Sequence, residues 1–317
     1  PLRAAAFASL GGAASKAAAA SAKLSSGSAA AAAVEAPGVA TAPRDCVKQH
    51  FRDDPHQHPL DAAGVVGGQV EKVGAKLPAR KVESYMLMHP VYTQEEVESV
   101  TITHRPPEDV YDRVALGVVK TLRGTFDVMT GYGFLEFNER RWLTRFLFLE
   151  TVAGVPGMVG AMLRHLRSLR LLRRDHGWIH TLLEEAENER MHLLTFLKLK
   201  QPGMFFRGAV AGTQVVFSSL FFASYMVSPT TCHRFVGYLE EEAVRTYTKA
   251  IEQLDAGKLP VWEEQRAPQI ALDYWRLPED AKIRDLLMAV RCDEANHRYV
   301  NHTFSSLHRD AANPFDK

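Results

Sequence analysis

Apolar residues recur with helical spacing from about residue 109 onward, and short groups of Gly, Pro, Asp and Ser interrupt them. Apolar positions three and four residues apart form one face of a helix, whereas a half-buried strand alternates every second residue. No segment alternates convincingly as a strand. Ser228 suits a helix start and Gly257 a helix end. The pattern predicts an all-α protein with helices over 109–130, 140–172, 178–199, 204–227, 230–255 and 280–308.

Two segments before residue 109 have a different composition. Residues 1–43 are mostly Ala, Ser and Gly with few charges, and Glu35 is the single acid among them. This composition is typical of an organelle transit peptide, and a disordered leader without an address is the alternative. Residues 44–108 contain many prolines, which leave no room for a long helical stripe. We expect an extended N-terminal arm there, followed by a helical domain over 109–310.

Two of the predicted helices have features of membrane-binding helices. Residues 208–227 are twenty positions without a charged side chain, which is nominally long enough to span a bilayer. Helix 109–130 is amphipathic, with Val114 and Val118 near one face and Lys120 near another. The two helices together predict an apolar platform that lies in one leaflet. Burial in the bundle core and a true membrane span are the alternatives.

Composition and charge exclude several classes of protein. The chain is 46% hydrophobic and 24% charged, which is typical of a globular protein, and its net charge of +1 gives no general attraction to nucleic acid. A mean hydropathy of −0.17 argues against a multi-span membrane protein. The three cysteines are too widely separated for a disulfide framework or a thiolate metal site. A metal would therefore need carboxylate and imidazole ligands, and the 13 histidines allow this.

Four helices carry a recurrent set of metal-ligand residue types. Glu-x-x-His occurs twice, at Glu189–His192 and Glu294–His297, and each pair lies on one helix face. Glu150 and Glu240 interrupt apolar helix faces. One Glu from each of two helices and one Glu-x-x-His from each of the other two is the ligand set of ferritin-like di-iron or di-manganese bundles. Four carboxylates facing one interior require cations, whereas the alternative leaves each Glu solvated on a helix surface.

Other residues near these positions have two interpretations each. Tyr247 lies two turns after Glu240 and could supply an electron or a proton, although periodicity alone favours a packed core tyrosine. Asn188 and Asp293 adjoin ligands and could orient the histidines, or be solvated. Gly154 and Gly157 follow Glu150 on nearly the same face, so we expect this stretch to leave space.

Four stretches in this order contain the candidate ligands: Leu149-Glu150-Thr151-Val152-Ala153, Asn188-Glu189-Arg190-Met191-His192-Leu193, Leu239-Glu240-Glu241-Glu242-Ala243 and Arg291-Cys292-Asp293-Glu294-Ala295-Asn296-His297. They resemble the signature boxes of the alternative oxidases, which are mitochondrial, cyanide-insensitive quinol oxidases. The resemblance covers about residues 85–308, and one departure from it is that Cys292 and Asn296 replace residues commonly seen as Ala and as His or Glu.

The resemblance implies a site built from three groups of residues. Two non-haem iron ions per chain would be held by Glu150, Glu189, His192, Glu240, Glu294 and His297. Tyr247 would be the catalytic tyrosine. The quinol would be bound by Arg123, Arg145, Leu149, Glu242, Ala243 and Thr246. The ligands would be oriented by Asn188, His233, Trp275 and Asp293.

The resemblance also implies an activity and a location. The chain would oxidise ubiquinol with O2 without pumping protons, on the matrix side of the mitochondrial inner membrane and bound to the lipid of one leaflet. It would form homodimers that exchange their N-terminal arms, residues 44–108. The alternatives are a plastid plastoquinol oxidase, another di-iron hydroxylase or ferroxidase, and a metal-free helical scaffold on the membrane.

Overall fold

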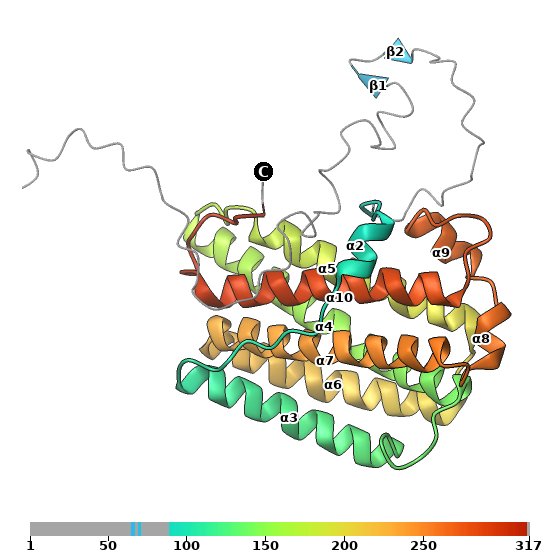
Figure 1. The fold of residues 1–317 in the computed structure, drawn as a ribbon. Coiled ribbons are helices and arrows are strands. Elements are labelled where there is room, and N and C mark those ends of the chain that lie inside the picture. Colours follow the sequence, from blue (N-terminus) through green and yellow to red (C-terminus); the bar gives the residue numbers. More distant parts are fainter. Residues whose placement is uncertain (1–64, 67–68, 71–88, 316–317) are drawn as a thin grey trace, which may run out of the picture. The chain divides into compact units, whose positions relative to one another are not determined.

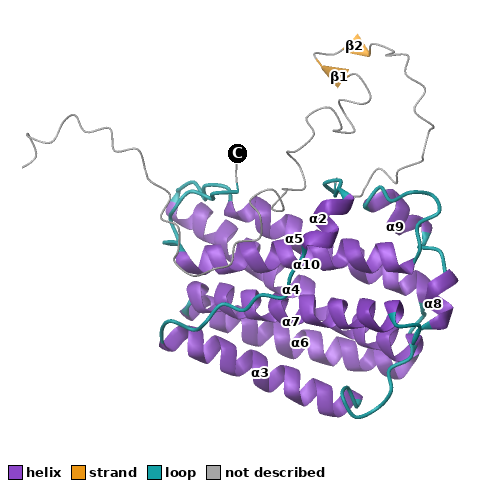
Figure 2. Cartoon of the chain, in the orientation of Figure 1, coloured by secondary structure: helices purple, strands orange, loops and turns teal. Residues whose placement is uncertain are grey.

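The computed structural model describes residues 65–66, 69–70 and 89–315, and helices make up most of the described chain from residue 94 on (Figures 1 and 2). The predicted transit peptide, residues 1–43, and most of the predicted arm lie outside the described residues. The long helices are α3 (Val110–Thr130), α4 (Glu139–Leu171), α5 (Trp178–Leu199), α6 (Met204–Val227), α7 (Pro229–Asp255) and α10 (Ile283–Ser306). The all-α prediction is confirmed.

The six predicted helices agree with these bounds to within three residues, because local capping signals mark their ends. Asp109 begins α3 by accepting a hydrogen bond from the backbone N–H of Asp112, and Gly131 ends it with a φ of 71°. Ser228 begins α7 as expected. The last helix begins at Ile283 instead of 280, where the Asp285 carboxylate accepts the backbone N–H of Lys282 at 2.8 Å.

Short elements that the apolar pattern did not predict also occur. Within the expected arm, β1 (Val65–Val66) pairs antiparallel with β2 (Gln69–Val70), and Thr93 and Glu96 form a capping box that begins α2 (Gln94–Ser99). Two further short helices, α8 (Pro260–Glu264) and α9 (Gln269–Tyr274), connect α7 to α10. Each is too short to show a helical repeat of apolar residues.

Two closely packed helix pairs form the centre of the molecule: α4 with α5, and α7 with α10 (Figure 1). A glycine allows each close approach. A Cβ atom at Gly157 would lie 2.6 Å from the backbone oxygen of Leu182 on α5, and one at Gly237 would lie 2.5 Å from the His302 ring on α10. The space expected after Glu150 is therefore filled by the backbone of α5.

The remaining two long helices pack outside these pairs, α3 against α7 and α6 against α4 and α7. Ala115 and Val119 of α3 are buried with Phe221 and Tyr225 of α6 in one apolar cluster. The outer faces of both helices stay exposed and apolar. Among the described residues, α4 and α6 are long and apolar enough to cross a membrane, but α4 also carries the buried Glu150.

Candidate metal centre

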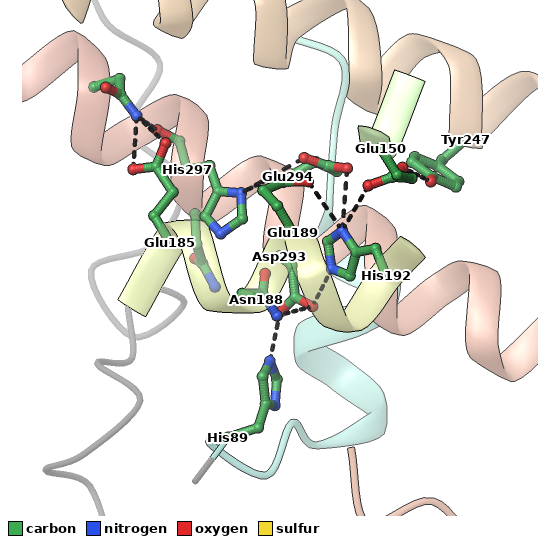
Figure 3. Close-up of polar contacts among 12 residues, drawn as sticks. His89, Glu150, Glu185, Asn188, Glu189, His192, Tyr247, Asp293, Glu294 and His297 are labelled. Atoms are coloured by element: carbon green, nitrogen blue, oxygen red, sulfur yellow. Dashed lines mark hydrogen bonds and ion pairs between the residues drawn. The ribbon is translucent and has the colours of Figure 1, made fainter. Parts of the chain in front are cut away.

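The four paired helices bring all six predicted ligands into one buried cluster. Glu150 comes from α4 and Glu240 from α7, while α5 and α10 each supply one Glu-x-x-His pair, at Glu189–His192 and at Glu294–His297. Each of the six side chains is buried. Figure 3 shows the two imidazoles facing the carboxylates between them. Residues far apart in sequence meet here because the helices run alongside one another. Glu150 and Tyr247, for example, are 97 residues apart.

Two carboxylates lie between the two histidines, with one oxygen toward each ring. Glu189 places Oε2 3.4 Å from Nδ1 of His192 and Oε1 2.8 Å from Nδ1 of His297. Glu294 places Oε1 3.6 Å from Nδ1 of His192 and Oε2 3.6 Å from Nδ1 of His297. Glu150 completes the His192 side, with Oε2 3.3 Å from Nδ1. The arrangement fits two neighbouring ions bridged by two carboxylates.

The donor atoms form two four-residue groups, and within each group they all lie within 4.8 Å of one another. Glu189 and Glu294 belong to both groups. The first group is Glu150, Glu189, His192 and Glu294, and the second is Glu189, Glu240, Glu294 and His297. Carboxylate oxygens and imidazole nitrogens without a thiolate suit iron or manganese.

The protonation equilibria of the cluster show why it needs cations. Burial raises the pKa of Glu150 to about 8. Burial, followed by the charges of Glu294 and Glu189, raises the pKa of Glu240 well above its usual range. Burial also opposes ionisation of Glu189, but the adjacent His192 and His297 hold its pKa below the usual range. Without a metal, protons must supply the positive charge that the buried carboxylates require.

Unsatisfied polar atoms support the same conclusion. Glu150, Glu189, His192, Glu294 and His297 each keep at least one buried oxygen or nitrogen that has no hydrogen-bond partner. A buried polar atom without a partner costs free energy, so a concentration of them requires an explanation. Two divalent cations would satisfy these atoms and would balance the charge of four carboxylates. The donor set therefore fits two metal ions.

Asp293 holds one of the histidines from the side opposite the carboxylates. Its Oδ2 accepts hydrogen bonds from Nε2 of His192 at 2.9 Å, Nε1 of Trp275 at 2.8 Å and Nδ2 of Asn188 at 3.1 Å. With its proton on Nε2, His192 presents Nδ1 to the carboxylates. The structure thus brings three of the four predicted orienting residues together. It adds His89 and Tyr92, which both bond Oδ1 and which no pattern in the sequence indicates.

The fourth predicted orienting residue, His233, lies further from the cluster. Its Nδ1 donates to Oδ1 of Asn301 at 3.1 Å, and Asn301 in turn bonds the backbone oxygen of His297 and the carboxylate of Glu185. Burial raises the pKa of Glu185 to about 7. Glu185 precedes Glu189 by four residues on the same helix face, a spacing that could have identified it.

Tyr247 points directly into the cluster. Its hydroxyl donates a hydrogen bond to Oε1 of Glu150, and its ring stacks on Phe146 with centroids 4.7 Å apart. The side chain is 2% exposed. The ring therefore packs in the core, while the hydroxyl contacts a candidate ligand, and the transfer of an electron or a proton by Tyr247 stays a prediction.

The residues predicted to bind quinol form a polar cluster beside Tyr247. Arg123 donates from Nη1 to Oγ1 of Thr246 at 2.9 Å and lies 3.3 Å from the Glu242 carboxylate. Asp127 bridges this group to Arg145, because it accepts from Nε of Arg123 at 2.8 Å and from Nη2 of Arg145. Asp127 was not selected from the sequence, although it follows Arg123 by four residues.

Two other predicted quinol residues, Leu149 and Ala243, are half-buried on α4 and α7, next to Glu150 and Glu242 in sequence. Arg145 is almost fully buried and its guanidinium lies over the rings of Tyr132 and Phe126, with centroid distances of 4.2 and 4.8 Å. The quinol-binding role of all these residues stays a prediction.

The fold and the site define a class: a four-helix bundle with a buried carboxylate–histidine site for two metal ions. Comparison with known proteins is consistent with this class. The family model described as "Alternative oxidase" matches residues 92–306. The chain belongs to the alternative oxidase family.

Several curated relatives carry the name "Alternative oxidase, mitochondrial". The chain is 58% identical to one from Aspergillus niger over 233 residues, which are 70% of this chain and 66% of that protein. It is 57% identical over 239 residues to one from Emericella nidulans, covering 72% and 68%. A relative from Cryptococcus neoformans var. grubii is 43% identical over 304 residues, covering 89% and 72%. The match thus spans about two thirds of the length of the first two relatives.

Proposed function

We propose that this chain is a mitochondrial di-iron ubiquinol:oxygen oxidoreductase that does not pump protons. One observation carries the proposal: Glu189 and Glu294 each direct one oxygen toward His192 and the other toward His297. Glu189 and Glu294 belong to both groups of donors, so they would contribute to holding each of two metal ions. Membership of the alternative oxidase family supports iron as the metal and a quinol as the reductant.

The proposed reaction balances with two quinols for each O2. Each quinol gives up two electrons and two protons, so two quinols supply what one O2 needs to form two waters. The iron ions, when bound, supply the oxygen reduction that side chains cannot perform. The chain's own residues bind the quinol, exclude water and move protons.

The polar cluster around Arg123 is the proposed quinol site. Arg123 and Thr246 offer a guanidinium and a hydroxyl that can hydrogen-bond the quinol oxygens, and Asp127 fixes the direction of both Arg123 and Arg145. Leu149 and Ala243 would contact the apolar part of the ring. Thr246 adjoins Tyr247 in sequence, which puts the proposed site next to the residue that reaches Glu150.

Tyr247 and Glu150 are the proposed proton carriers between quinol and metal. The Tyr247 hydroxyl donates to Glu150 Oε1, while Glu150 Oε2 faces His192. The hydrogen bond from the buried Tyr247 hydroxyl to Glu150 offers a path for protons from the quinol side toward the metal centre.

The membrane position is also a proposal. Helices α3 and α6 turn one side to α7 and the other side, which is apolar, outward. A quinol with a long apolar tail dissolves in the bilayer, so an enzyme that lies in one leaflet can take it up without a transmembrane step. Because electrons and protons enter and leave on one side, no charge would cross the membrane. In the proposed homodimer the partners would exchange the parts of their N-terminal arms that precede residue 89, because residues 89–105 contact the bundle of their own chain.

The test is oxygen uptake by the purified chain with a short-chain ubiquinol in the presence of cyanide. We expect uptake by the wild-type chain, about two irons per chain by metal analysis, and loss of both in Glu189→Ala, because Glu189 contacts both histidines. Two irons without quinol-dependent uptake would overturn the substrate and favour a hydroxylase or a ferroxidase. Turnover by Glu189→Ala at the wild-type rate would overturn the site.

A further inference from the structure

The carboxylate of Asp293 has two sets of donors, one for each oxygen. The donors to Oδ2 belong to the helical bundle and its α9–α10 connection: His192, Asn188 and Trp275. The donors to Oδ1 come from the segment before α2, where Nε2 of His89 lies 2.7 Å away and the hydroxyl of Tyr92 2.5 Å away. Figure 3 shows His89 approaching Asp293 from below, on the side away from the carboxylate cluster.

Asn296 sets the direction of the Tyr92 hydroxyl. Its Nδ2 donates to the Tyr92 oxygen at 2.9 Å, so the hydroxyl's own hydrogen is free to point at Asp293. Asn296 is buried, and it stands where the family's box commonly has His or Glu. Of the two residues commonly seen there, an ionised Glu could not donate this hydrogen bond, because a carboxylate only accepts, whereas the N–H of a His could. Asn296 supplies the donor in this chain.

The segment that carries His89 and Tyr92 is fastened to the bundle through its backbone. We call residues 89–105 the strap. Arg291 donates to the backbone oxygen of Val97 at 2.8 Å, and Arg298 donates to that of Thr101 at 3.1 Å. At the far end of the strap, Glu241 accepts the backbone N–H of Arg105 at 2.8 Å. Because these contacts are made by backbone atoms of the strap, substitutions of His89 or Tyr92 should leave the strap in place along α10 and α7.

We propose that His89, Tyr92 and Asn296 are positioning residues for the metal ion bound by Glu150 and His192. We call these three residues the clamp. His89 and Tyr92 bond Oδ1 of Asp293, and Asn296 orients Tyr92. Asp293 in turn directs Nδ1 of His192 toward the carboxylates. Asp293 is 1% exposed in the intact chain, so its donors are protein groups and not bulk water. A carboxylate that loses its donors on one side moves or rotates to find others, and His192 follows it.

The clamp acts on one metal position and not on the other. The group that includes His192 depends on Asp293, whereas the group that includes His297 contains no residue that bonds it. Loosening the clamp should therefore weaken one of two ions selectively. A general loss of folding would weaken both. This inference rests on the metal centre of the proposed function, and the experiment separates the two.

The experiment is an anaerobic titration of the full chain with Co²⁺, followed by visible absorption and equilibrium dialysis. We expect the wild-type chain to bind two ions. In Tyr92→Phe, His89→Ala and Asn296→Leu, one dissociation constant should rise about 10- to 100-fold and the other should stay unchanged. His89→Gln keeps an N–H donor near the position of Nε2, so it should restore most of the loss seen in His89→Ala.

Gln94→Ala is the matched control. Gln94 is exposed, lies two residues from Tyr92, and bonds Glu98 instead of Asp293, so both dissociation constants should match the wild type. Equal weakening of both ions in the clamp variants, or no weakening, would overturn the clamp. A wild-type chain that binds no Co²⁺ would overturn both proposals. Selective weakening in a chain that has no quinol oxidase activity would support the clamp and overturn the function.

Discussion

At the scale of single residues, hydrogen-bond partners distinguish side chains that are otherwise alike. Tyr238 and Tyr247 both lie on α7 and both are almost fully buried. The hydroxyl of Tyr247 donates to Glu150, whereas that of Tyr238 has no hydrogen-bond partner in the described chain. Burial alone would give the two tyrosines the same importance, and only the partner connects Tyr247 to the metal centre.

This contrast predicts the effect of removing each hydroxyl. In Tyr247→Phe the ring can still stack on Phe146, so we expect a folded chain with wild-type iron content. Its quinol-dependent oxygen uptake should fall by about 100-fold or more, because the hydroxyl proposed to carry protons to Glu150 is lost. Tyr238→Phe removes an unpaired hydroxyl and should keep full activity. Equal rates for Tyr247→Phe and the wild type would contradict the role given to Tyr247.

His233 predicts a dependence of stability on pH. Burial lowers its pKa from 6.5 to about 4. Between these values the unfolded chain binds a proton that the folded chain does not, so stability falls as the pH drops through this window. The loss approaches about 3 kcal/mol at its acid end. Above pH 6.5 this contribution is fully present.

The measurement is urea unfolding of the wild type and of His233→Gln, from about pH 7.5 to about pH 4.5. Glutamine does not titrate, but it can donate to Asn301 and accept from Tyr225, as His233 does. The stability advantage of the wild type should shrink as the pH falls, while acid effects common to both chains cancel. Parallel stability curves would show that burial does not lower the pKa of His233.

At the scale of helices, the distance between α4 and α5 sets the geometry of the metal centre. Glu150 is on α4, while Glu189 and His192 are on α5, and Gly157 lies where the two backbones meet. A methyl group there would come within 2.6 Å of the Leu182 backbone oxygen. Because a helix backbone cannot yield as a flexible side chain does, the two helices would have to separate.

We therefore expect Gly157→Ala to destabilise the chain by about 1–3 kcal/mol, the usual cost of overpacking, and to lower its metal content. Gly117→Ala on α3 is the matched control. Nothing lies within 4 Å of a Cβ at Gly117, so this change should leave metal binding intact and stabilise α3 slightly. Thermal unfolding and metal analysis of both variants make the comparison. Wild-type stability of Gly157→Ala would mean that the helices are not in close contact there.

Local signals explain which elements and residues could be predicted from the sequence. The long helices show an apolar repeat, and each of the two Glu-x-x-His pairs can be recognised from the spacing of its residues within its own helix. Asp127 could have been found from its spacing to Arg123. His89 and Tyr92 could not, because their partner Asp293 is 204 and 201 residues away and no repeat marks the strap. The prediction that Gly154 and Gly157 leave free space was wrong. The absence of a side chain is equally compatible with close packing, and the α5 backbone lies there.

At the scale of the whole molecule, the apolar outer helices α3 and α6 pack outside the helix pairs that hold the metal centre. Glu240 of α7 faces the metal cluster, whereas α3 packs on another side of α7 and turns Val114, Val118 and Leu122 to the surface. On α6, Leu220 and Val216 are exposed in the same way. Exposed apolar surface on two neighbouring long helices, next to the proposed quinol site, is typical of a membrane-binding face.

If α3 and α6 form the proposed membrane-binding face, charges placed on it should release the chain from lipid without disturbing the metal centre. Val118→Glu and Leu220→Glu change exposed side chains on α3 and α6, so the fold and the iron content should be kept. Each carboxylate must stay hydrated and opposes insertion, and the double variant should float with vesicles several-fold less than the wild type. Val261→Glu on α8 is the matched control, because Val261 is also exposed but lies outside these helices. Its flotation should equal that of the wild type.

With a water-soluble quinol all the chains should consume oxygen at similar rates, whereas with a long-tailed quinol in vesicles the double variant should be slow. Wild-type flotation of the double variant would mean that α3 and α6 do not face the membrane.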